Sequence, residues 1–393
     1  MKVLQINTFG NLSTGKIAVD IYRTLKAHGS DGVVAFARND APSDVPSIRI
    51  GSSFSVYTDG VRTRLTDKAG HYSKGATKKL IEQIREYGPD IIHLHNLHGY
   101  YINVPMLFAF LKEYNKPVVW TLHDCWAYTG HCCYYSMAGC DKWKNGCCDC
   151  PQLSTYPASL SKDNSKNNYE EKKALFHSVP NLNLVCVSEW LNNELKESFL
   201  KDLPARVIYN GIDTDIFKPT EGDFRKKYGL EDKRIVLGVA STWDTRKGLN
   251  DFIKLSDLLD DRYKIVLVGL SDKEKASIPD SILGIGRTDG PKELAEIYTT
   301  SDVLFNASVE ETFGLPNVEA LACGTPVVAY DCTGIPETLG ENDGYIVEAH
   351  DLTAVIEKIG KICDEHKRID VSTFRFKKEE SYEEYMKLYE ELI

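Results

Sequence analysis

The chain has 393 residues, of which 42% are hydrophobic and 26% are charged, and its formal net charge at pH 7 is −10. This length favours two or three domains, and the composition is typical of a globular protein. The apolar runs are short and interrupted by charges, which excludes a bilayer-spanning segment. The acidic balance argues against nucleic-acid binding. The N-terminal apolar stretch is too short for a signal peptide, so the sequence predicts a cytoplasmic protein.

Charge is divided unevenly along the chain. Residues 1–205 hold 23 Lys+Arg and 20 Asp+Glu, a net of +3, whereas residues 206–393 hold 24 and 37, a net of −13. The first half includes a group of cations at Arg62, Arg64, Lys68, Lys74, Lys78, Lys79 and Arg85. A solvated helix face is the plainer interpretation of this group. The alternative is contact with anionic lipid headgroups or a diphosphate-linked lipid acceptor at the inner face of the cell membrane.

Apolar runs rich in Val, Ile and Leu alternate with amphipathic stretches, a pattern that indicates buried parallel strands joined by helices. The first series of predicted strands covers residues 3–6, 33–37, 91–95, 118–122 and 184–187. The second series covers residues 235–239, 264–268, 303–306, 327–330 and 344–347. Each series is long enough for one domain, so we predict an α/β protein with two Rossmann-like, doubly wound parallel-sheet domains.

The two predicted domains meet near residues 206–219, where Asn210-Gly211 marks a turn. We therefore predict an N-terminal domain over 1–205 and a C-terminal domain over 206–376. Residues 377–393 predict a charged helix with tyrosines and leucines at helical spacing, and we expect it to pack back on the N-terminal domain. Residues 159–173 are rich in Ser, Asn and Lys and predict a loop.

Two glutamates, Glu311 and Glu319, lie eight positions apart after the predicted strand 303–306. Between them stands Pro316, a residue favoured at the first position of a helix. A helix start suits phosphate groups, and carboxylates accept hydrogen bonds from sugar hydroxyls. An ordinary capped helix is the alternative interpretation. On the ligand interpretation, a phosphate is expected to meet the free amides of Leu315, Asn317 and Val318.

A pair of cations follows another strand of the same domain. Arg246 and Lys247 stand just beyond the predicted strand 235–239 and before a helix. Ligands of parallel α/β sheets bind at the carboxyl ends of strands, and two cations there can neutralise a diphosphate leaving group. The glutamate run and the cation pair together favour a sugar-nucleotide site.

The N-terminal half offers polar residues at its own strand ends. His123 and Asp124 close the predicted strand 118–122, so we expect them to point into the cleft between the predicted domains. The alternative is a His–Asp pair that only stabilises its loop. His93 and His95 would share one strand face, which allows a metal site, but packing at the strand end is the plainer interpretation. Residues 10–17 imitate a phosphate-binding P-loop, but Ile17 replaces the required Ser or Thr. A glycine at position 15 would instead let the backbone approach a bound ligand closely.

Seven of the eleven cysteines fall between Cys125 and Cys150. The spacing of Cys132, Cys140, Cys147 and Cys150 is compatible with a structural zinc ion. The alternative is a loop that the thiols simply pack, since stable disulfides are not expected in the cytoplasm.

These motifs resemble those of the retaining glycosyltransferases of family 4. The match comprises Glu311 with Glu319, the Phe313-Gly314 pair between them, residues 322–328 and Lys247-Gly248. The resemblance extends over essentially the whole chain and is most specific in the C-terminal half. It implies the GT-B fold, with two Rossmann-like domains facing across a cleft. It also implies a nucleotide-sugar donor in the C-terminal domain, an acceptor in the N-terminal domain, and no cofactor or catalytic metal.

The resemblance also implies residue roles. Glu319 would hold the ribose hydroxyls, Glu311 the donor sugar and Lys247 the diphosphate. Many members have an arginine where this chain has Thr242, so Arg246 is a candidate replacement. A subset of polysaccharide enzymes has a similar His-Asp-x-Trp segment, which makes His123 a donor-sugar or leaving-group contact and Asp124 an acceptor contact. The predicted donor-binding set is Gly15, Arg246, Lys247, Phe313, Gly314, Leu315, Asn317, Val318 and Glu319, and the predicted catalytic set is His123, Asp124, Lys247 and Glu311.

The sequence therefore predicts a metal-independent hexosyltransferase that acts with retention of configuration. Its donor would be a nucleoside-diphosphate sugar, with UDP as the favoured nucleotide. Its acceptor would be a growing glycan or a lipid-linked saccharide of polysaccharide biosynthesis. The alternatives are a GT-B-fold sugar-nucleotide epimerase or hydrolase, a glycan-binding module without catalysis and, least favoured, a P-loop ATPase.

Overall fold

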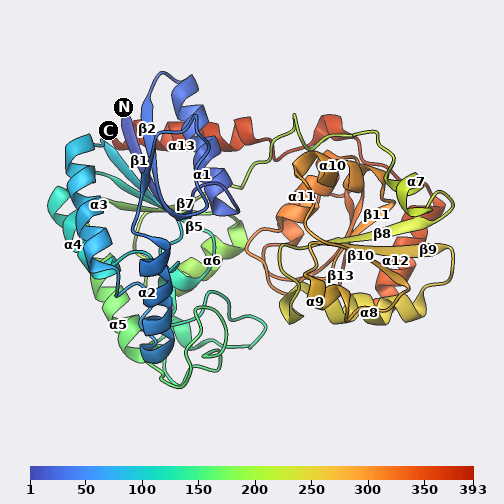
Figure 1. Cartoon of the computed structure of the whole chain (residues 1–393), viewed down its shortest axis with the longest axis horizontal. Coiled ribbons are helices and arrows are strands. Elements are labelled where there is room, and N and C mark those ends of the chain that lie inside the picture. The colour runs from blue at the N-terminus through green and yellow to red at the C-terminus, as the bar shows by residue number, and fades with distance from the viewer. The chain divides into compact units, whose positions relative to one another are not determined.

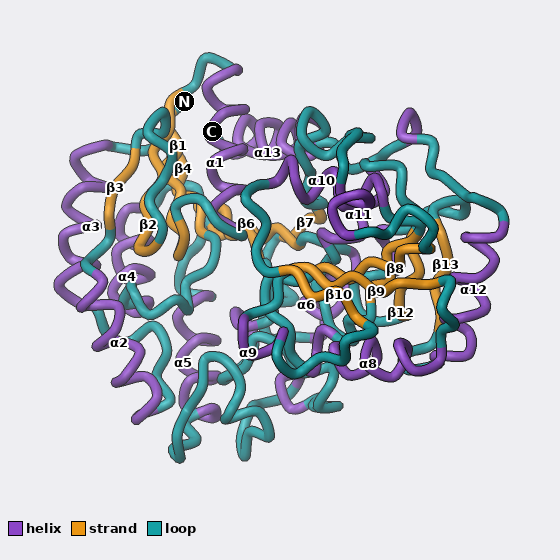
Figure 2. Tube along the Cα trace, turned by 45° about the vertical axis from the view of Figure 1, so that its right-hand side comes forward, coloured by secondary structure: helices purple, strands orange, loops and turns teal.

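The computed structural model describes all 393 residues, which form two compact units (Figure 1). Unit 1 comprises Met1–Tyr209 and Glu379–Ile393, and unit 2 comprises Asn210–Lys378. The strands of each unit form one layer, with helices packed against it (Figure 2). No helix combines the length and the apolar character needed to cross a membrane.

Unit 1 is built on a seven-stranded parallel sheet with the strand order β3-β2-β1-β4-β5-β6-β7. The strands are β1 (Lys2–Phe9), β2 (Asp31–Arg38), β3 (Ser47–Arg49), β4 (Ile91–Leu94), β5 (Val118–Leu122), β6 (Leu182–Cys186) and β7 (Ala205–Val207). The chain order reverses between β1 and β4, which pair with each other directly. Ligands of such sheets bind near this reversal, at the carboxyl ends of the strands.

Helices cover both faces of the unit 1 sheet. They are α1 (Thr14–Ala27), α2 (Ser53–Thr66), α3 (Lys74–Tyr87), α4 (Val104–Tyr114), α5 (Ser165–Phe176), α6 (Glu189–Glu197) and α13 (Lys378–Leu392), with 3-10 turns η1 (Trp126–Tyr128) and η2 (Lys142–Lys144). Neighbouring residues of β5 point to opposite faces. Val119 packs in a cluster with α1 and α13, whereas Trp120 packs against Phe108 of α4 and Phe176 of α5.

Unit 2 has a six-stranded parallel sheet with the order β10-β9-β8-β11-β12-β13. Its strands are β8 (Arg234–Val239), β9 (Tyr263–Val268), β10 (Ile282–Ile285), β11 (Val303–Asn306), β12 (Val327–Tyr330) and β13 (Gly344–Val347). Its helices are α7 (Phe224–Tyr228), α8 (Leu249–Leu258), α9 (Asp272–Lys275), α10 (Pro291–Thr300), α11 (Leu315–Ala322) and α12 (Leu352–Asp364), with turns η3 (Thr245–Lys247), η4 (Pro336–Thr338) and η5 (Val371–Thr373). Helices α10 and α11 lie on one face and α8, α9 and α12 on the other (Figure 1).

The predicted fold class agrees with these two parallel sheets, and every predicted strand overlaps an observed one. Three strands were missed: β3, β7 and β10. All three lie at sheet edges and are partly exposed, so they lack the continuous apolar run that marks a buried parallel strand.

The predicted loop over 159–173 is wrong in its second half, because α5 begins at Ser165. Several of its polar residues are buried, among them Ser165, Asn168 and Lys172. The side-chain amide of Asn168 donates to the carbonyl oxygens of Asp67 and Gly130, at 2.6 and 3.0 Å. Composition alone cannot distinguish polar side chains that make such buried hydrogen bonds from the polar side chains of a solvent-exposed loop.

Helix α13 closes the core of unit 1 through tyrosine hydroxyls. Tyr389 hydrogen-bonds with Nδ1 of His93 at 2.6 Å, and Nε2 of His93 hydrogen-bonds with the hydroxyl of Thr121 at 2.8 Å. Tyr385 reaches the same Thr121 hydroxyl at 3.0 Å. All four side chains are buried, so each polar group has its partner inside the core.

This network makes unit 1 sensitive to acid. Burial, with a smaller contribution from His123, lowers the pKa of His93 from 6.5 to about 3. Between these values the unfolded chain binds a proton that the folded chain does not, so stability is lost as the pH falls below 6.5. The loss amounts to at most about 1.4 kcal/mol per pH unit for such a group. We expect His93→Gln, which cannot take up this proton, to lose less melting temperature between pH 7.5 and 5.5 than the wild type.

The matched control is His366→Gln, since His366 is exposed. It should keep the wild-type pH dependence. An unchanged acid sensitivity in His93→Gln would show that another group is responsible.

Candidate active site

Two loops of unit 2 are joined where β8 and β11 end. Gly248 has a φ of +74°, and a Cβ atom there would fall 2.3 Å from the carbonyl oxygen of Ala307. The N–H of Val309 donates to the carbonyl of Arg246 at 3.0 Å, and the guanidinium of Arg246 donates to the carbonyl of Glu310 at 2.9 Å. The glycine thus permits the close approach that brings the cation pair beside the first glutamate.

At this junction Nζ of Lys247 donates to Oε1 of Glu311 at 2.6 Å. The two side chains are only 15% and 11% exposed. Burial alone would raise the pKa of the Glu311 carboxyl, but the charge and hydrogen bond of Lys247 and a hydrogen bond from Ser308 hold it below its usual value. The result is a charged pair with little water around it, in which each partner depends on the other.

A third loop fixes the backbone of Glu311. The Thr333 hydroxyl accepts from the N–H of Glu311 at 2.8 Å and donates to its carbonyl at 2.6 Å. The N–H of Gly334 donates to the same carbonyl at 3.0 Å. Thr333 has a φ of +52°, a conformation that a threonine rarely adopts. Its role was not visible in the sequence because no motif links it to Glu311.

Helix α11 begins differently from the prediction. It starts at Leu315 after Gly314, whose φ is +98°. The N–H of Asn317 is not free, because it donates to the carbonyl of Gly314 at 3.0 Å. Val318 is fully buried, and Phe313 packs edge-on against Phe376 with ring centroids 5.3 Å apart. Phe313 and Val318 therefore shape the helix start from the core.

The second glutamate has a partner that the sequence did not reveal. The hydroxyl of Tyr298, on α10, donates to Oε2 of Glu319 at 2.9 Å. Burial and then the nearby Glu319 raise the pKa of Tyr298 well above its usual value, so its hydroxyl stays a donor. This bond fixes one carboxylate oxygen of a half-buried side chain. No fixed spacing connects a tyrosine of one helix with a glutamate of the next.

In unit 1, three ring nitrogens and one amide form a chain beneath the end of β5. Nε2 of His123 lies 3.1 Å from Nδ1 of His95, and Nε2 of His95 lies 3.1 Å from the side-chain oxygen of Gln5. Burial lowers the pKa of His123 to about 4 and that of His95 well below its usual value. Both rings are therefore neutral near pH 7, and His95 positions the His123 ring.

Asp124 is held by a second set of contacts. Its carboxylate hydrogen-bonds with Nε2 of His98 at 2.8 Å and accepts from the N–H of Trp126 at 2.9 Å. His98, Asp124 and Cys133 place potential metal-ligand atoms within 4.8 Å of one another. Nδ1 of His98 also has a partner, the Tyr156 hydroxyl at 3.2 Å, so the ring is satisfied without an ion.

The segment after His123 is pinned by a buried amine. Nζ of Lys172, on α5, donates to the carbonyls of Trp126 and Thr129 at 2.6 and 3.0 Å, and it lies 3.4 Å from the centroid of the Trp126 ring. Burial lowers the pKa of Lys172 to about 7. Lys172 gave no signal in the sequence, because it stands in the stretch predicted to be a loop.

Gly15 occupies the second position of α1, and its small size is needed by the fold. A Cβ atom there would fall 2.5 Å from the carbonyl oxygen of Phe9, the last residue of β1. The backbone does approach closely at Gly15, but the approach is between the start of α1 and the end of β1. The role of Gly15 at a ligand stays a prediction.

All eleven cysteines are free thiols. One cavity is lined by His131 together with Cys132, Cys140, Cys147 and Cys150, the four cysteines singled out by their spacing. Nδ1 of His131 hydrogen-bonds with the Asp67 carboxylate, whereas its buried Nε2 has no partner. A zinc-binding histidine commonly has such a carboxylate on its other nitrogen.

The structural zinc stays a prediction, to which the cavity adds His131 as a fifth candidate ligand. Elemental analysis of purified protein tests it: stoichiometric zinc supports the site, and its absence leaves the thiols as packing of the loop.

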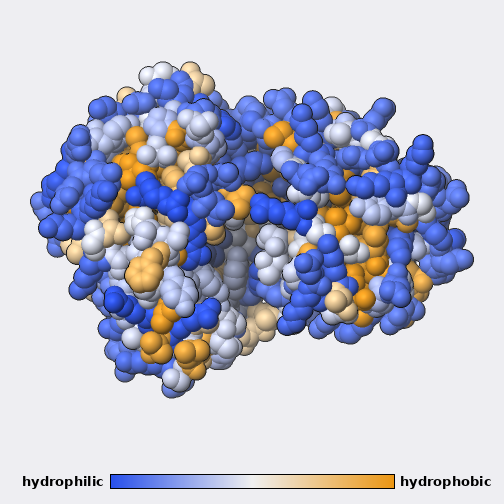
Figure 3. Space-filling model, in the orientation of Figure 1, coloured by the Kyte–Doolittle hydropathy of each residue, from blue (hydrophilic) through white to orange (hydrophobic).

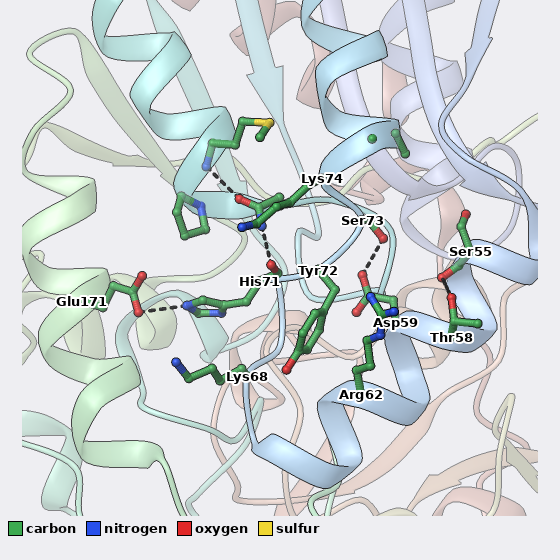
Figure 4. Close-up of a pocket in the computed structure, with 15 residues that line it drawn as sticks. Ser55, Thr58, Asp59, Arg62, Lys68, His71, Tyr72, Ser73, Lys74 and Glu171 are labelled. Atoms are coloured by element: carbon green, nitrogen blue, oxygen red, sulfur yellow. Dashed lines mark hydrogen bonds and ion pairs between the residues drawn. The ribbon is translucent and has the colours of Figure 1, made fainter.

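A cavity of about 990 Å³ lies among four helices of unit 1 (Figure 4). Helix α2 contributes Asp59 and Arg62, and the residues around the start of α3 contribute Lys68, His71 and Lys74. His71 is held toward the cavity by Glu171 of α5, through a hydrogen bond of 2.9 Å.

Two family models match the chain. "Glycosyltransferase Family 4" matches residues 15–216, and "Glycosyl transferases group 1" matches residues 220–381. The chain belongs to glycosyltransferase family 4. It is therefore a glycosyltransferase, as the resemblance of its motifs implied.

Two relatives are similar to this chain in sequence over part of their length. A putative colanic acid biosynthesis glycosyl transferase, WcaC, of Escherichia coli is 26% identical over 281 residues, which cover 70% of this chain and 67% of that protein. N-acetyl-alpha-D-glucosaminyl L-malate synthase of Bacillus anthracis is 31% identical over 189 residues, which cover 44% of this chain and 48% of that protein.

Solved structures resemble this chain over its whole length. Sucrose-phosphate synthase from Thermosynechococcus elongatus has a TM-score of 0.69 at 18% identity, over 100% of this chain and 99% of that chain. Alr3699/HepE of Anabaena, in complex with UDP-glucose, has a TM-score of 0.69 at 14% identity, over 100% of both chains. These likenesses confirm the predicted GT-B fold with two Rossmann-like domains.

Proposed function

We propose that this glycosyltransferase transfers a hexose with retention of configuration and without a metal ion, from a UDP-linked donor bound by unit 2. The observation that supports this most is the junction of the β8 and β11 loops, where Lys247 and Arg246 stand beside Glu311. Fixed cations stabilise a departing diphosphate best where water is scarce, and Lys247 is only 15% exposed. UDP is favoured because the similar structure Alr3699/HepE was obtained with UDP-glucose.

Each residue of unit 2 would have a distinct task. Lys247, with Arg246 beside it, binds the diphosphate. Glu311 holds the Lys247 ammonium in place through their 2.6 Å hydrogen bond and accepts from hydroxyls of the donor sugar. Glu319, oriented by the hydrogen bond from Tyr298, accepts from the ribose hydroxyls. The amide of Leu315 and the left-handed turn at Gly314 lie at the same helix start.

Unit 1 would hold the acceptor and part of the donor sugar. His123 is neutral, because burial lowers its pKa to about 4, so it acts as a hydrogen-bond donor or acceptor to the sugar or leaving group. Burial would raise the pKa of Asp124, but the charge and hydrogen bond of His98, the N–H of Trp126 and the nearby His123 together hold it below its usual value. Asp124 therefore stays ionised near pH 7 and can accept a hydrogen bond from an acceptor hydroxyl.

The proposed reaction balances without an added base. The bond between the sugar's anomeric carbon and the diphosphate oxygen breaks, and the oxygen keeps the electron pair. The acceptor hydroxyl oxygen bonds to the same face of that carbon, and its proton passes to the departing diphosphate. Lys247 and Arg246 stabilise the charge that develops on the diphosphate.

The proposed setting is polysaccharide biosynthesis, as the name of the Escherichia coli relative suggests. The acceptor would be a growing glycan or a lipid-linked saccharide, reached at the cytoplasmic side of the cell membrane through peripheral contact by unit 1.

Replacing Lys247 by alanine tests the donor site. Because the variant lacks a cation that stabilises the departing diphosphate, we expect the rate of sugar transfer to fall by about a hundredfold or more. The measurement is transfer of label from a panel of radioactive UDP-sugars to membranes of a polysaccharide-producing bacterium, with release of UDP measured in parallel.

Lys254→Ala is the matched control, because Lys254 lies on the following helix with a side chain that is 66% exposed. It should retain wild-type transfer. Turnover near the wild-type level in Lys247→Ala would contradict the assignment, provided that both variants melt like the wild type.

A further inference from the structure

Helix α2 has its apolar stripe on the outside. Phe54, Tyr57, Val61 and Leu65 are 75%, 70%, 41% and 57% exposed. At 100° per residue they fall within an arc of about 80° on the helix surface. In Figure 3, hydrophobic side chains interrupt the hydrophilic surface over this part of unit 1. An exposed stripe of this kind indicates a binding surface.

The inward face of the same helix is mostly polar, so the apolar residues of α2 lie mainly on its exposed side. Its buried residues are Val56, Asp59 and Thr63. Asp59 accepts hydrogen bonds from the hydroxyls of Ser73 at 2.5 Å and Thr63 at 3.3 Å. The bond from Ser73, which lies outside α2, ties the inward face of the helix to the neighbouring segment and leaves the apolar stripe toward solvent.

A loop residue extends the apolar surface at the end of α2. Leu160 is 71% exposed. Its N–H donates to the carbonyl of Arg64 at 2.8 Å, which places it beside the last turns of the helix. Leu160 thus adds a fifth exposed apolar side chain near the end of the stripe.

Cations border this surface. At 100° per residue Arg62 and Arg64 lie on opposite sides of the stripe. Residues 53–85 contain seven Lys/Arg and three Asp/Glu, a net of +4 in a chain whose net charge is −10. Two of the three acids, Asp59 and Asp67, are buried. An apolar stripe with flanking cations is the pattern of helices that lie in the interface of an anionic membrane.

The cavity of about 990 Å³ begins on the Arg62 side of α2 (Figure 4). Arg62, Lys68 and Lys74 line it and come from three different segments, and none of them forms an ion pair with a carboxylate of the protein. The hydroxyls of Ser55 and Thr58 line it as well. Asp59 and Glu171 also line the cavity, but each is already bonded within the protein, to Ser73 and Thr63 and to His71. Three cations with hydroxyl donors suit a phosphate ester better than a neutral sugar.

We propose that α2 lies in the membrane interface and that the adjoining cavity takes the phosphate group of a phosphorylated lipid. The stripe from Phe54 to Leu65 would insert among the acyl chains. Arg62, Lys68 and Lys74 would then contact the phosphate. The inference rests on the proposed function in one respect, since such a lipid is the carrier of the saccharide acceptor.

Charge distinguishes this occupant from a second copy of the chain. A symmetric dimer through α2 would bring the cation-bordered surfaces of two copies together, which is unfavourable. An anionic lipid surface neutralises them.

The test is co-sedimentation of the full chain with vesicles. We expect binding to phosphatidylcholine vesicles that contain phosphatidic acid or a polyprenyl phosphate, and weak binding to phosphatidylcholine alone. Phe54→Ser with Leu65→Ser should reduce binding about tenfold or more, because the stripe then lacks two membrane anchors. Leu258→Ser, at a residue of unit 2 that is also 57% exposed, should change nothing.

A second pair of variants tests the cavity. Arg62→Gln with Lys74→Gln should remove the preference for phosphatidic acid over phosphatidylserine at equal surface charge. Lys78→Gln with Lys79→Gln, on exposed residues of α3 outside the cavity, should keep it. No preference in the wild type would overturn the phosphate site, and equal binding of wild type and Phe54→Ser/Leu65→Ser would overturn the membrane face.

A failure of this proposal is distinguishable from a failure of the proposed function. UDP binding, followed by thermal shift, involves unit 2 and should be the same in all four double or single variants. Loss of vesicle binding with intact UDP binding is the expected pattern. Inorganic diphosphate that abolishes vesicle binding supports the cavity, whereas diphosphate that binds without any binding to vesicles would assign the cavity to a free phosphate and overturn the lipid.

Discussion

The ion pair between Lys247 and Glu311 is the contact on which the proposed donor site depends. It joins the loops that follow β8 and β11, and the absence of a side chain at Gly248 allows those loops to touch. Separating two nearly buried charges would leave each without compensation, which costs more than the pair contributes by forming. The pair therefore fixes the loops in one arrangement. It also keeps a cation ready at a strand end where diphosphates bind in this fold.

In unit 1 the corresponding polar core consists of buried histidines that are neutral near pH 7. His93 and His95 have no access to water, and their ring nitrogens find partners on α13, β5 and β1. The network positions His123 at the end of β5 without adding charge. Lys172 holds the segment that follows. The buried polar core beneath the end of β5 is thus separate from the exposed apolar face of α2, which we propose for membrane contact.

The sequence predicted the parts of the structure that are buried and periodic. β11 (Val303–Asn306) was located to the residue, because a central parallel strand is a continuous apolar run. The glutamates and Lys247 were found because the family motif preserves their spacing. Contacts between side chains far apart in sequence left no such signal: Tyr298 with Glu319, Thr333 with Glu311, and His131 beside the cysteines. The exposed apolar face of α2 was also missed, since exposure is a property of the fold and not of the helix alone.

The central claim is that the loop of Lys247 binds the diphosphate of a nucleotide. Titration calorimetry with UDP and with uridine, which lacks the diphosphate, tests it most directly. Combining Lys247→Met with Glu311→Gln removes the cation without leaving a buried carboxylate unpaired. The account predicts that the wild type binds UDP at least about tenfold more tightly than uridine, and that the double variant loses this difference. A double variant that still prefers UDP to the same degree would contradict the account.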